Sequence, residues 1–132
     1  MHLAPRGDIY DMNDSNPLAL FRYAAQELGK RKLAFLCSRE SLGANRIGPE
    51  IKKAFGGTYI ANEGFTQETA EQVIAAGEAD AVAFGKLFIA NPDLPERFAK
   101  NLPLNSPNPE TFYASGPQGY TDYPCLSQPA NV

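Results

Sequence analysis

Residues 58–86, TYIANEGFTQETAEQVIAAGEADAVAFGK, decide the fold of this chain. Two short apolar segments, residues 58–61 and 79–84, enclose a stretch whose apolar residues recur at helical spacing. Thr66 is a suitable N-cap for that helix, and Gly77 is a suitable end for it. A strand, a helix and a second buried strand in this order are typical of a β–α–β unit with parallel strands.

The same alternation extends toward the amino terminus. Residues 32–37, KLAFLC, form another short apolar run, and residues 1–5 look like the end of a further strand. Helices are expected over residues 17–28, with Asn16 or Ser15 as cap and Gly29 as end, and over residues 49–55. Two short helical pieces, over residues 87–90 and 95–100, are expected after the fourth strand. The order strand–helix therefore occurs four times, which indicates an α/β protein with a parallel sheet.

An irregular carboxyl-terminal segment follows the fourth unit. We predict that residues 1–100 form the α/β part and that residues 101–132, with six of the eleven prolines, form a tail packed on it. The aromatic residues of this tail argue against a disordered linker. Two architectures fit four strand–helix units: a free-standing doubly wound sheet, and half of a (β/α)8 barrel, which takes about 250 residues in full.

Composition excludes several classes of function. The 132 residues carry 12 Lys and Arg against 15 Asp and Glu, and this net charge of −3 does not favour nucleic-acid binding. No apolar run is as long as a membrane helix, and the first residues lack a signal-peptide pattern. One histidine and two distant cysteines are too few for a metal site or a disulfide scaffold. We expect a soluble cytoplasmic protein without metal, membrane or nucleic-acid partners.

Two glycines predict a phosphate site. In parallel α/β folds, ligands bind beyond the carboxyl ends of the strands. Gly64 and Gly85 follow two successive predicted strands, and a glycine lets its backbone N–H approach an anion closely. Lys86 adds a positive charge beside the second glycine. Each glycine alone is explained by a tight strand–helix turn, but both together with Lys86 favour a phosphate ligand.

Other candidate residues have simpler interpretations. His2, the only histidine, lies at a strand end, where a single histidine is usually just exposed. Cys37 follows apolar residues and is interpreted as a small buried side chain rather than a nucleophile. Asp80 and Asp93 are expected to cap helices or form ion pairs. The tyrosines of the tail, Tyr113 among them, either stack on a ligand ring or pack the tail, and packing is favoured.

Several longer motifs resemble the carboxyl-terminal part of the old yellow enzyme family. They are DSNPLALF at residues 14–21, ADAVAFGKLFIANPDL at 79–94, PLN at 103–105, TFY at 111–113 and GYTDYP at 119–124. Members of that family are FMN-dependent ene-reductases built on one (β/α)8 barrel. The resemblance covers essentially the whole chain. It implies that the chain is the carboxyl-terminal half of such a barrel, from the fifth strand to the eighth, with the closing tail.

The resemblance also implies roles for particular residues. The FMN phosphate is expected at the turn after the predicted third strand and at the Gly–Lys pair, and the flavin ring is expected at His2. The implied cofactor-binding residues are His2, Asn62, Glu63, Gly64, Phe65, Gly85 and Lys86. The family usually has arginine at the positions of His2 and Lys86, and its substrate pocket includes a tyrosine at the position of Tyr113.

The chemistry implied by the resemblance is hydride transfer. In the family, NADH or NADPH reduces the flavin, which then reduces activated alkenes, nitro compounds or nitrate esters. The His/Asn or His/His pair that holds the substrate oxygen belongs to the amino-terminal half of the barrel, so no catalytic residue is expected in this chain. We therefore expect the isolated chain to be inactive until an amino-terminal half-barrel completes it.

Two other hypotheses stay open. A four-stranded half-barrel has two open sheet edges and an uncovered apolar face, which fits a non-catalytic element that self-associates. An independent module of doubly wound type is the third hypothesis, and it predicts binding of small phosphates without a preference for flavin. Flavin binding, oligomeric state and ligand preference distinguish the three hypotheses.

Overall fold

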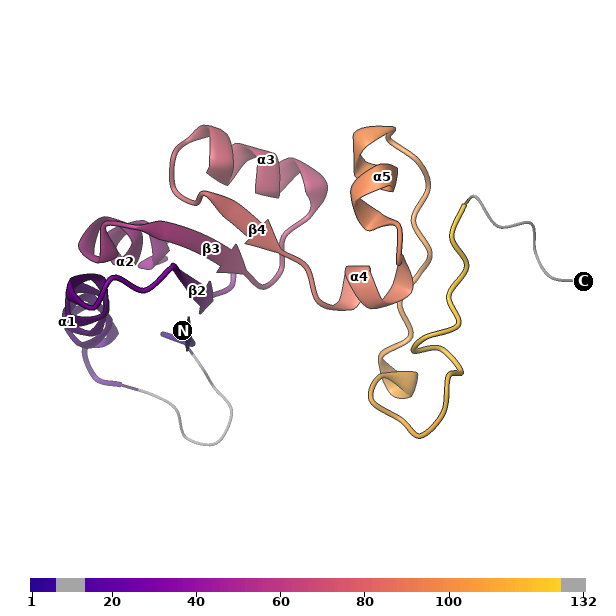
Figure 1. The fold of residues 1–132 in the computed structure, drawn as a ribbon, viewed down its shortest axis with the longest axis horizontal. Coiled ribbons are helices and arrows are strands. Elements are labelled where there is room, and N and C mark those ends of the chain that lie inside the picture. The colour runs from indigo at the N-terminus through magenta and orange to yellow at the C-terminus, as the bar shows by residue number, and fades with distance from the viewer. Residues whose placement is uncertain (7–13, 127–132) are drawn as a thin grey trace, which may run out of the picture. The chain divides into compact units, whose positions relative to one another are not determined.

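The computed structural model describes residues 1–6 and 14–126, in which strands and helices alternate (Figure 1). The chain divides into two compact units, residues 1–83 and residues 84–132. The first unit contains β1 (His2–Leu3), α1 (Pro17–Lys30), β2 (Phe35–Arg39), α2 (Gly48–Phe55), β3 (Thr58–Asn62), α3 (Gln67–Ala75) and β4 (Ala81–Ala83). The second unit contains α4 (Lys86–Ala90), α5 (Leu94–Ala99) and the short 3-10 helix η1 (Pro109–Thr111). The expected division into residues 1–100 and 101–132 stays a prediction.

The strands of the first unit form one parallel sheet in the order β1-β2-β3-β4. In this order each strand–helix unit places its strand beside the previous one. His2 of β1 pairs with Cys37, Arg39 of β2 pairs with Asn62, and Asn62 in turn pairs with Ala83. The α/β class predicted from the sequence is therefore confirmed, and the carboxyl ends of β2, β3 and β4 share one edge of the sheet.

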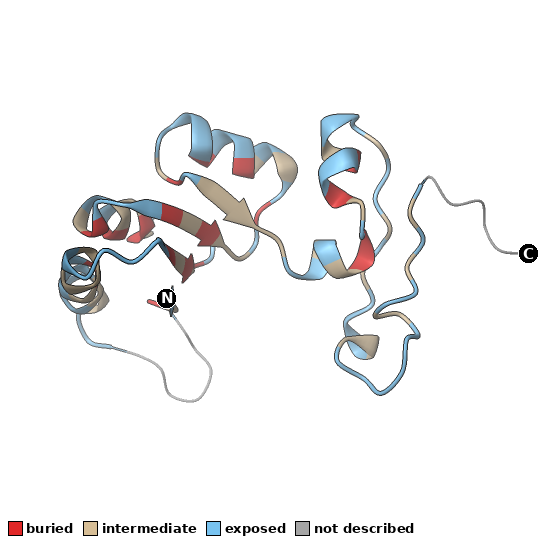
Figure 2. Ribbon diagram, viewed as in Figure 1, coloured by how far each residue is buried: buried red, intermediate tan, exposed pale blue. Residues whose placement is uncertain are grey.

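Buried and less buried residues alternate along β2 and β3 (Figure 2), so the two faces of the sheet differ in burial. Leu36 and Ser38 of β2, with Tyr59 and Ala61 of β3, lie on one face and are at most 5% exposed. Helix α2 contacts both strands. Phe35, on the other face of β2, is 47% exposed. The core of the first unit thus lies on the face that the helices cover, and the opposite face is only partly covered by this chain.

Side-chain caps fix the starts of α1 and α3, as the sequence predicts. The Asn16 side chain accepts a hydrogen bond from the Ala19 N–H at 3.2 Å, and proline occupies the first helical position. Thr66 accepts from the Thr69 N–H at 3.2 Å, and the Thr69 hydroxyl accepts from the Thr66 N–H at 2.9 Å. The second pair is a reciprocal capping box, which satisfies two helix-end donors at once.

Gly29 has a different role from the one expected. Helix α1 continues through Lys30, so the expectation that Gly29 ends the helix is wrong. A Cβ atom at Gly29 would collide with the backbone carbonyl of Phe55 at the end of α2. The missing side chain therefore lets α1 and α2 approach closely, which is a requirement of packing between segments distant in sequence.

Strand β2 begins later than the apolar run that predicts it. Lys32 has a φ of 53°, and its N–H donates to the Gly29 carbonyl at 3.0 Å, which completes the end of α1. The first residues of the run 32–37 are therefore used in this turn, and the strand is shifted to Phe35–Arg39. β4 is also shorter than the predicted residues 79–84.

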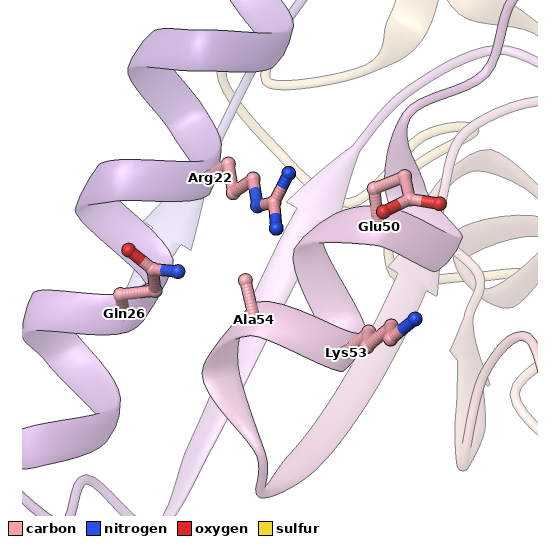
Figure 3. A pocket seen from close by; sticks show the side chains of 5 residues that line it. All are labelled: Arg22, Gln26, Glu50, Lys53 and Ala54. Carbon is pink, nitrogen blue, oxygen red and sulfur yellow. The ribbon is translucent and has the colours of Figure 1, made fainter.

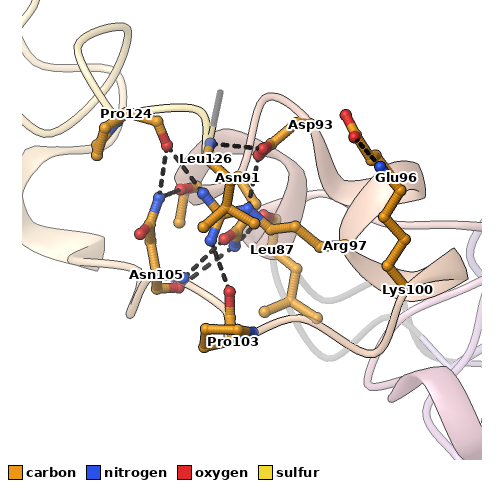
Figure 4. A network of polar contacts seen from close by, with 11 residues as sticks. Leu87, Asn91, Asp93, Glu96, Arg97, Lys100, Pro103, Asn105, Pro124 and Leu126 are labelled. Carbon is orange, nitrogen blue, oxygen red and sulfur yellow. Dashed lines mark hydrogen bonds and ion pairs between the residues drawn. The ribbon is translucent and has the colours of Figure 1, made fainter. Parts of the chain in front are cut away.

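In the second unit, a buried polar network binds the tail to α4 and α5 (Figure 4). Arg97 is 2% exposed and donates to the Asp93 carboxylate at 2.6 Å. The same guanidinium donates to the carbonyls of Pro103 and Pro124 at 2.6 and 3.0 Å. The Asn105 side chain donates to the carbonyl at the end of α4 at 2.8 Å. The described part of the tail is irregular apart from η1, as expected, and it is held by side-chain contacts instead of backbone ladders.

Candidate functional site

The turn after β3 has an unusual backbone. Glu63 and Gly64 have φ values of 90° and 77°, and a residue with a Cβ rarely adopts such a value. Gly64 is exposed, and a Cβ built on it meets no atom within 4 Å. No backbone partner is found for the Gly64 N–H among the described residues. The turn therefore presents an amide that has no backbone partner in the described part of the chain, at the carboxyl edge of the sheet, where parallel α/β folds bind anions.

Both ends of this turn are anchored. The Asn62 side chain donates to the Ala83 carbonyl at 2.8 Å, which ties β3 to β4. Phe65 is 7% exposed and lies in the core, directly before the Thr66 cap of α3. Asn62 and Phe65 are both residues for which the sequence suggests cofactor binding, and in this structure both hold the turn in place.

Glu63 contacts a residue that sequence reasoning does not single out. Its Oε2 lies 3.2 Å from Nε of Arg39 at the end of β2. The sequence places Arg39 in a loop at a strand end, among residues 37–40, and nothing local in the sequence indicates which acid it meets. The pairing follows from the sheet register, in which Arg39 and Asn62 are partners.

Gly85 and Lys86 follow β4 and begin the second unit. Gly85 is the N-cap of α4 and provides no side-chain cap. Lys86 is exposed and forms no ion pair with any residue in the described ranges. The last residue of β4, Ala83, pairs with Asn62, so this loop starts from the strand end adjacent to β3. The glycine and the lysine thus follow the neighbouring strand, as the phosphate-site prediction requires.

His2 and Cys37 lie side by side in register on β1 and β2. His2 is exposed, which agrees with the simple interpretation of a lone histidine at a strand end. Cys37 is half-buried, and this burial raises the pKa of its thiol. A raised pKa leaves little thiolate at neutral pH, so the structure agrees with a packing role for Cys37 and not with a nucleophile.

The tail tyrosines divide into two kinds. The Tyr123 hydroxyl accepts from the Asn108 N–H at 2.9 Å and so packs the tail. Tyr113 is 80% exposed, has a φ of 61°, and makes edge-to-face contacts with Phe112 and Tyr120 at centroid distances of 6.5 and 5.5 Å. The packing interpretation therefore fits Tyr123 but not Tyr113, which presents an aromatic ring to solvent.

Glu40 is a second residue that the sequence places only in a loop. Its carboxylate is buried, with the residue 5% exposed, and accepts from the N–H groups of Ile47 and Gly48 at 2.8 Å each. Arg6 Nε lies 3.3 Å from the same carboxylate. Glu40 thereby closes the loop between β2 and α2 and neutralises the start of α2. Its partners are distant in sequence, so only the fold shows this role.

Asp80 and Asp93 form bonds of the kind expected for them. Asp80 accepts from the Tyr59 N–H at 2.8 Å and from Lys52 Nζ at 2.9 Å, and in that order these bonds lower the pKa of its carboxyl. Asp93 accepts from the Leu126 N–H at 2.9 Å and from Arg97, and these bonds lower its pKa too. Both carboxylates are structural bridges.

A shallow pocket lies between α1 and α2, away from the turn residues in sequence (Figure 3). It is lined by Arg22, Gln26, Glu50, Lys53 and Ala54. The lining carries charges of both signs on exposed side chains, and it contains none of the residues proposed from the sequence. Within residues 1–6 and 14–126, no three His, Cys, Asp or Glu side chains gather as a metal site requires. No helix in these ranges has the length and hydropathy to cross a membrane.

Solved structures show the same architecture. The chain aligns with the old yellow enzyme homologue from Zymomonas mobilis with a TM-score of 0.89 and 41% identity, over 95% of this chain and 38% of that chain. The chain is a relative of the old yellow enzymes. Morphinone reductase aligns with a TM-score of 0.87 and 36% identity, over 99% of this chain and 37% of that chain. No protein-family model matches the sequence.

Curated sequences agree with the structural comparison. The 12-oxophytodienoate reductase 1 of Oryza sativa subsp. japonica is 41% identical over 140 residues, covering 97% of this chain and 36% of that protein. The chain thus spans little more than a third of the relatives it matches. The old yellow enzyme resemblance and the partial barrel that the sequence predicts are confirmed, with the parallel strands β1 to β4 as the barrel portion.

Proposed function

We propose that this chain is the phosphate-binding, carboxyl-terminal part of an FMN-dependent NAD(P)H oxidoreductase of the old yellow enzyme type. The observation that carries the proposal is the turn after β3, where Glu63 and Gly64 have positive φ and the Gly64 amide is unpaired within the described residues. A second glycine and an exposed lysine follow the adjacent strand β4. Backbone amides and a lysine are the donors that a phosphate group requires.

The residues of this chain fit the phosphate end of FMN. A Cβ built on Gly64 would meet no atom within 4 Å, so a ligand can approach there. Lys86 supplies a positive charge that forms no ion pair with the described residues. When bound, FMN supplies the capacity to accept and donate hydride. In this proposal Gly64, Gly85 and Lys86 hold the phosphate, His2 contacts the pyrimidine side of the flavin, and Tyr113 lines the substrate pocket.

Lysine at position 86 changes the quality of that phosphate contact. Its ammonium group is a compact point charge, whereas a guanidinium group forms two parallel hydrogen bonds to phosphate oxygens. We expect the Lys86 site to bind phosphate through charge, with affinity that decreases as ionic strength rises.

The substrates proposed for the completed enzyme are alkenes activated by a carbonyl or nitro group, nitro compounds or nitrate esters, with NADH or NADPH as reductant. The names of the relatives support this class, since they denote reductases of 12-oxophytodienoate and of morphinone. One related structure was solved with tetrahydroNAD, which supports a nicotinamide reductant. We assign no catalytic residue to this chain.

The partner proposed for the chain is the rest of the barrel. The sheet has open edges at β1 and β4, and Phe35 on its less buried face is 47% exposed. Such edges and faces associate with other strands and apolar surfaces. The two matched structures named above are much longer than this chain, which covers 38% or less of each, and their remaining part is the proposed source of these strands. A second copy of the chain is the alternative partner for these sheet edges and this exposed face.

A chimera tests the proposal. This chain replaces the matched 38% of the Zymomonas mobilis homologue, and the product is examined for bound flavin and for NADPH-driven reduction of an enone. We expect a yellow, active chimera, whereas the 132-residue chain alone shows weak FMN binding and no turnover. A folded chimera without flavin contradicts the phosphate-site assignment. Turnover by the chain alone contradicts the need for a partner, and a stable dimer in light scattering favours the second copy.

A further inference from the structure

Arg39 and Glu63 connect two neighbouring loops at the carboxyl edge of the sheet. Nε of Arg39, at the end of β2, lies 3.2 Å from Oε2 of Glu63 in the turn after β3, which is an ion-pair distance, while the buried Nε–H itself has no hydrogen-bond partner among the described residues. The side chains are 34% and 38% exposed, so the pair is partly shielded from water. Arg39 is the register partner of Asn62, the residue before Glu63. The ion pair therefore spans from one strand end directly to the turn on the next strand.

The backbone of Glu63 requires such a restraint. A φ of 90° is disfavoured for any residue with a Cβ, and it persists only where the surroundings hold it. Asn62 and Phe65 anchor the two ends of the turn, and neither of these contacts involves Glu63 or Gly64 themselves. Arg39 is the one side chain found in contact with the Glu63 carboxylate within the described ranges. Gly64, the next residue, adds freedom to the turn instead of restraint.

The contact with Arg39 also changes the charge of the turn. An unpaired carboxylate in an anion-binding turn repels the ligand, and the repulsion is strong where the site is partly shielded from water. The guanidinium of Arg39 neutralises Glu63. The same contact therefore removes a repulsive charge and fixes the backbone that carries the unpaired Gly64 amide.

We propose that Arg39 is a positioning residue for anion binding at the turn 62–65, acting through Glu63. The ligand is the FMN phosphate group assigned above, so this inference rests on the proposed function. Arg39 holds Glu63 and Gly64 in their positive-φ conformation and leaves the Gly64 amide free for the phosphate. The contact with the anion itself belongs to the backbone, not to the guanidinium.

The first measurement needs no ligand. Backbone ¹⁵N relaxation on the full 132-residue chain reports the order of the Gly64 amide. We expect a rigid amide, with an order parameter near ~0.85, and a decrease toward ~0.6 or below in Arg39→Met, which keeps the alkyl stem but loses the charge. Arg39→Lys keeps the charge and gives an intermediate value. Lys100→Met, which breaks the exposed Glu96 pair in the second unit, leaves Gly64 unchanged.

Exchanging the two charges separates positioning from a general loss of stability. Arg39→Glu and Glu63→Arg each disorder Gly64, and the double variant R39E/E63R restores its order because the ion pair is rebuilt with the opposite polarity. A rigid Gly64 amide in Arg39→Met overturns the proposal. A double variant that stays folded by circular dichroism but is as disordered at Gly64 as the single variants also overturns it.

The second measurement is the dissociation constant for FMN, followed by flavin fluorescence in the chimera described above. Arg39→Met weakens FMN binding about two- to fivefold, the factor that a partly exposed ion pair supplies, and R39E/E63R restores it. If R39E/E63R has an ordered Gly64 amide but still binds FMN weakly, Arg39 contacts the phosphate directly. That result contradicts a positioning role. The two proposals can also fail separately. If the parent chimera does not bind FMN, the proposed function is wrong. If the order parameter of Gly64 still decreases when the ion pair is broken, Arg39 nevertheless controls the turn.

Discussion

The Asp80 carboxylate accepts a hydrogen bond from the backbone N–H of Tyr59 at 2.8 Å and so ties the start of β4 to β3. This bond, followed by the bond from Lys52, holds the pKa of Asp80 below its ordinary value of 3.8. Because both donors bind the ionised carboxylate more strongly than the protonated carboxyl, the contact depends on pH.

We expect stability to be lost in acid. A carboxyl whose pKa is lower in the folded state binds fewer protons there, so its stabilisation is present above the unfolded pKa and disappears as pH falls through the folded pKa. Asp80 and Asp93 both follow this rule. The free energy of unfolding, measured with urea, should decrease below about pH 4. Asp80→Asn should flatten this decrease, whereas Glu110→Gln, at an exposed acid, should not. An unchanged slope in Asp80→Asn contradicts the assignment.

Gly29→Ala should destabilise the first unit. Alanine is normally the better helix former, by about 1 kcal/mol, but its Cβ would collide with the Phe55 carbonyl. We expect a net loss of about 1–3 kcal/mol in the free energy of unfolding, the range for overpacking in tight contacts. Gly43→Ala is the matched control, because a Cβ there meets nothing within 4 Å. A neutral or stabilising Gly29→Ala shows that α1 and α2 do not need this close approach.

Arg97→Met should release the tail. The substitution leaves the Asp93 carboxylate and the carbonyls of Pro103 and Pro124 without their buried donor. Loss of the shared donor from this network should destabilise the contact between the tail and α5. Limited proteolysis should then cleave within residues 101–126 at lower protease concentration. Lys100→Met removes only an exposed pair with Glu96, so its cleavage pattern should match the parent chain. If the tail resists the protease equally well in Arg97→Met and Lys100→Met, the Arg97 network does not anchor the tail.

Cys37 should react slowly with thiol reagents. Burial raises the pKa of its thiol and limits access, so less thiolate is available than in free cysteine at the same pH. The rate is measured with a disulfide reagent in Cys125→Ser, where Cys37 is the remaining cysteine. A rate equal to that of free cysteine indicates that the sheet face around Cys37 is open and mobile.

Local sequence signals predicted the elements well where the cause is local. The caps at Asn16 and Thr66 and the order of strands and helices were all correct. The error at Gly29 has a tertiary cause, since its partner Phe55 lies on another helix. The shift of β2 follows from the left-handed Lys32, whose turn uses residues that look like strand.

The phosphate site itself stays a prediction, made from glycines after consecutive strands and from a lysine beside the second one. The contacts of Arg39 and Glu40 were not predictable, because they depend on strand register and on loop closure between distant residues. The exposure of Tyr113 was also not predictable, because its φ of 61° comes from the fold of an irregular tail without a periodic pattern.

The preference for FMN over riboflavin tests the central claim most directly. The two ligands differ only in the phosphate group, so the ratio of their dissociation constants in the chimera isolates the proposed phosphate site. We predict that FMN binds at least about tenfold more tightly, as expected for charge-assisted hydrogen bonds. Lys86→Met should reduce this ratio, and Lys53→Met on α2 should leave it unchanged. Equal affinity for FMN and riboflavin, with a correctly folded chimera, would contradict the account.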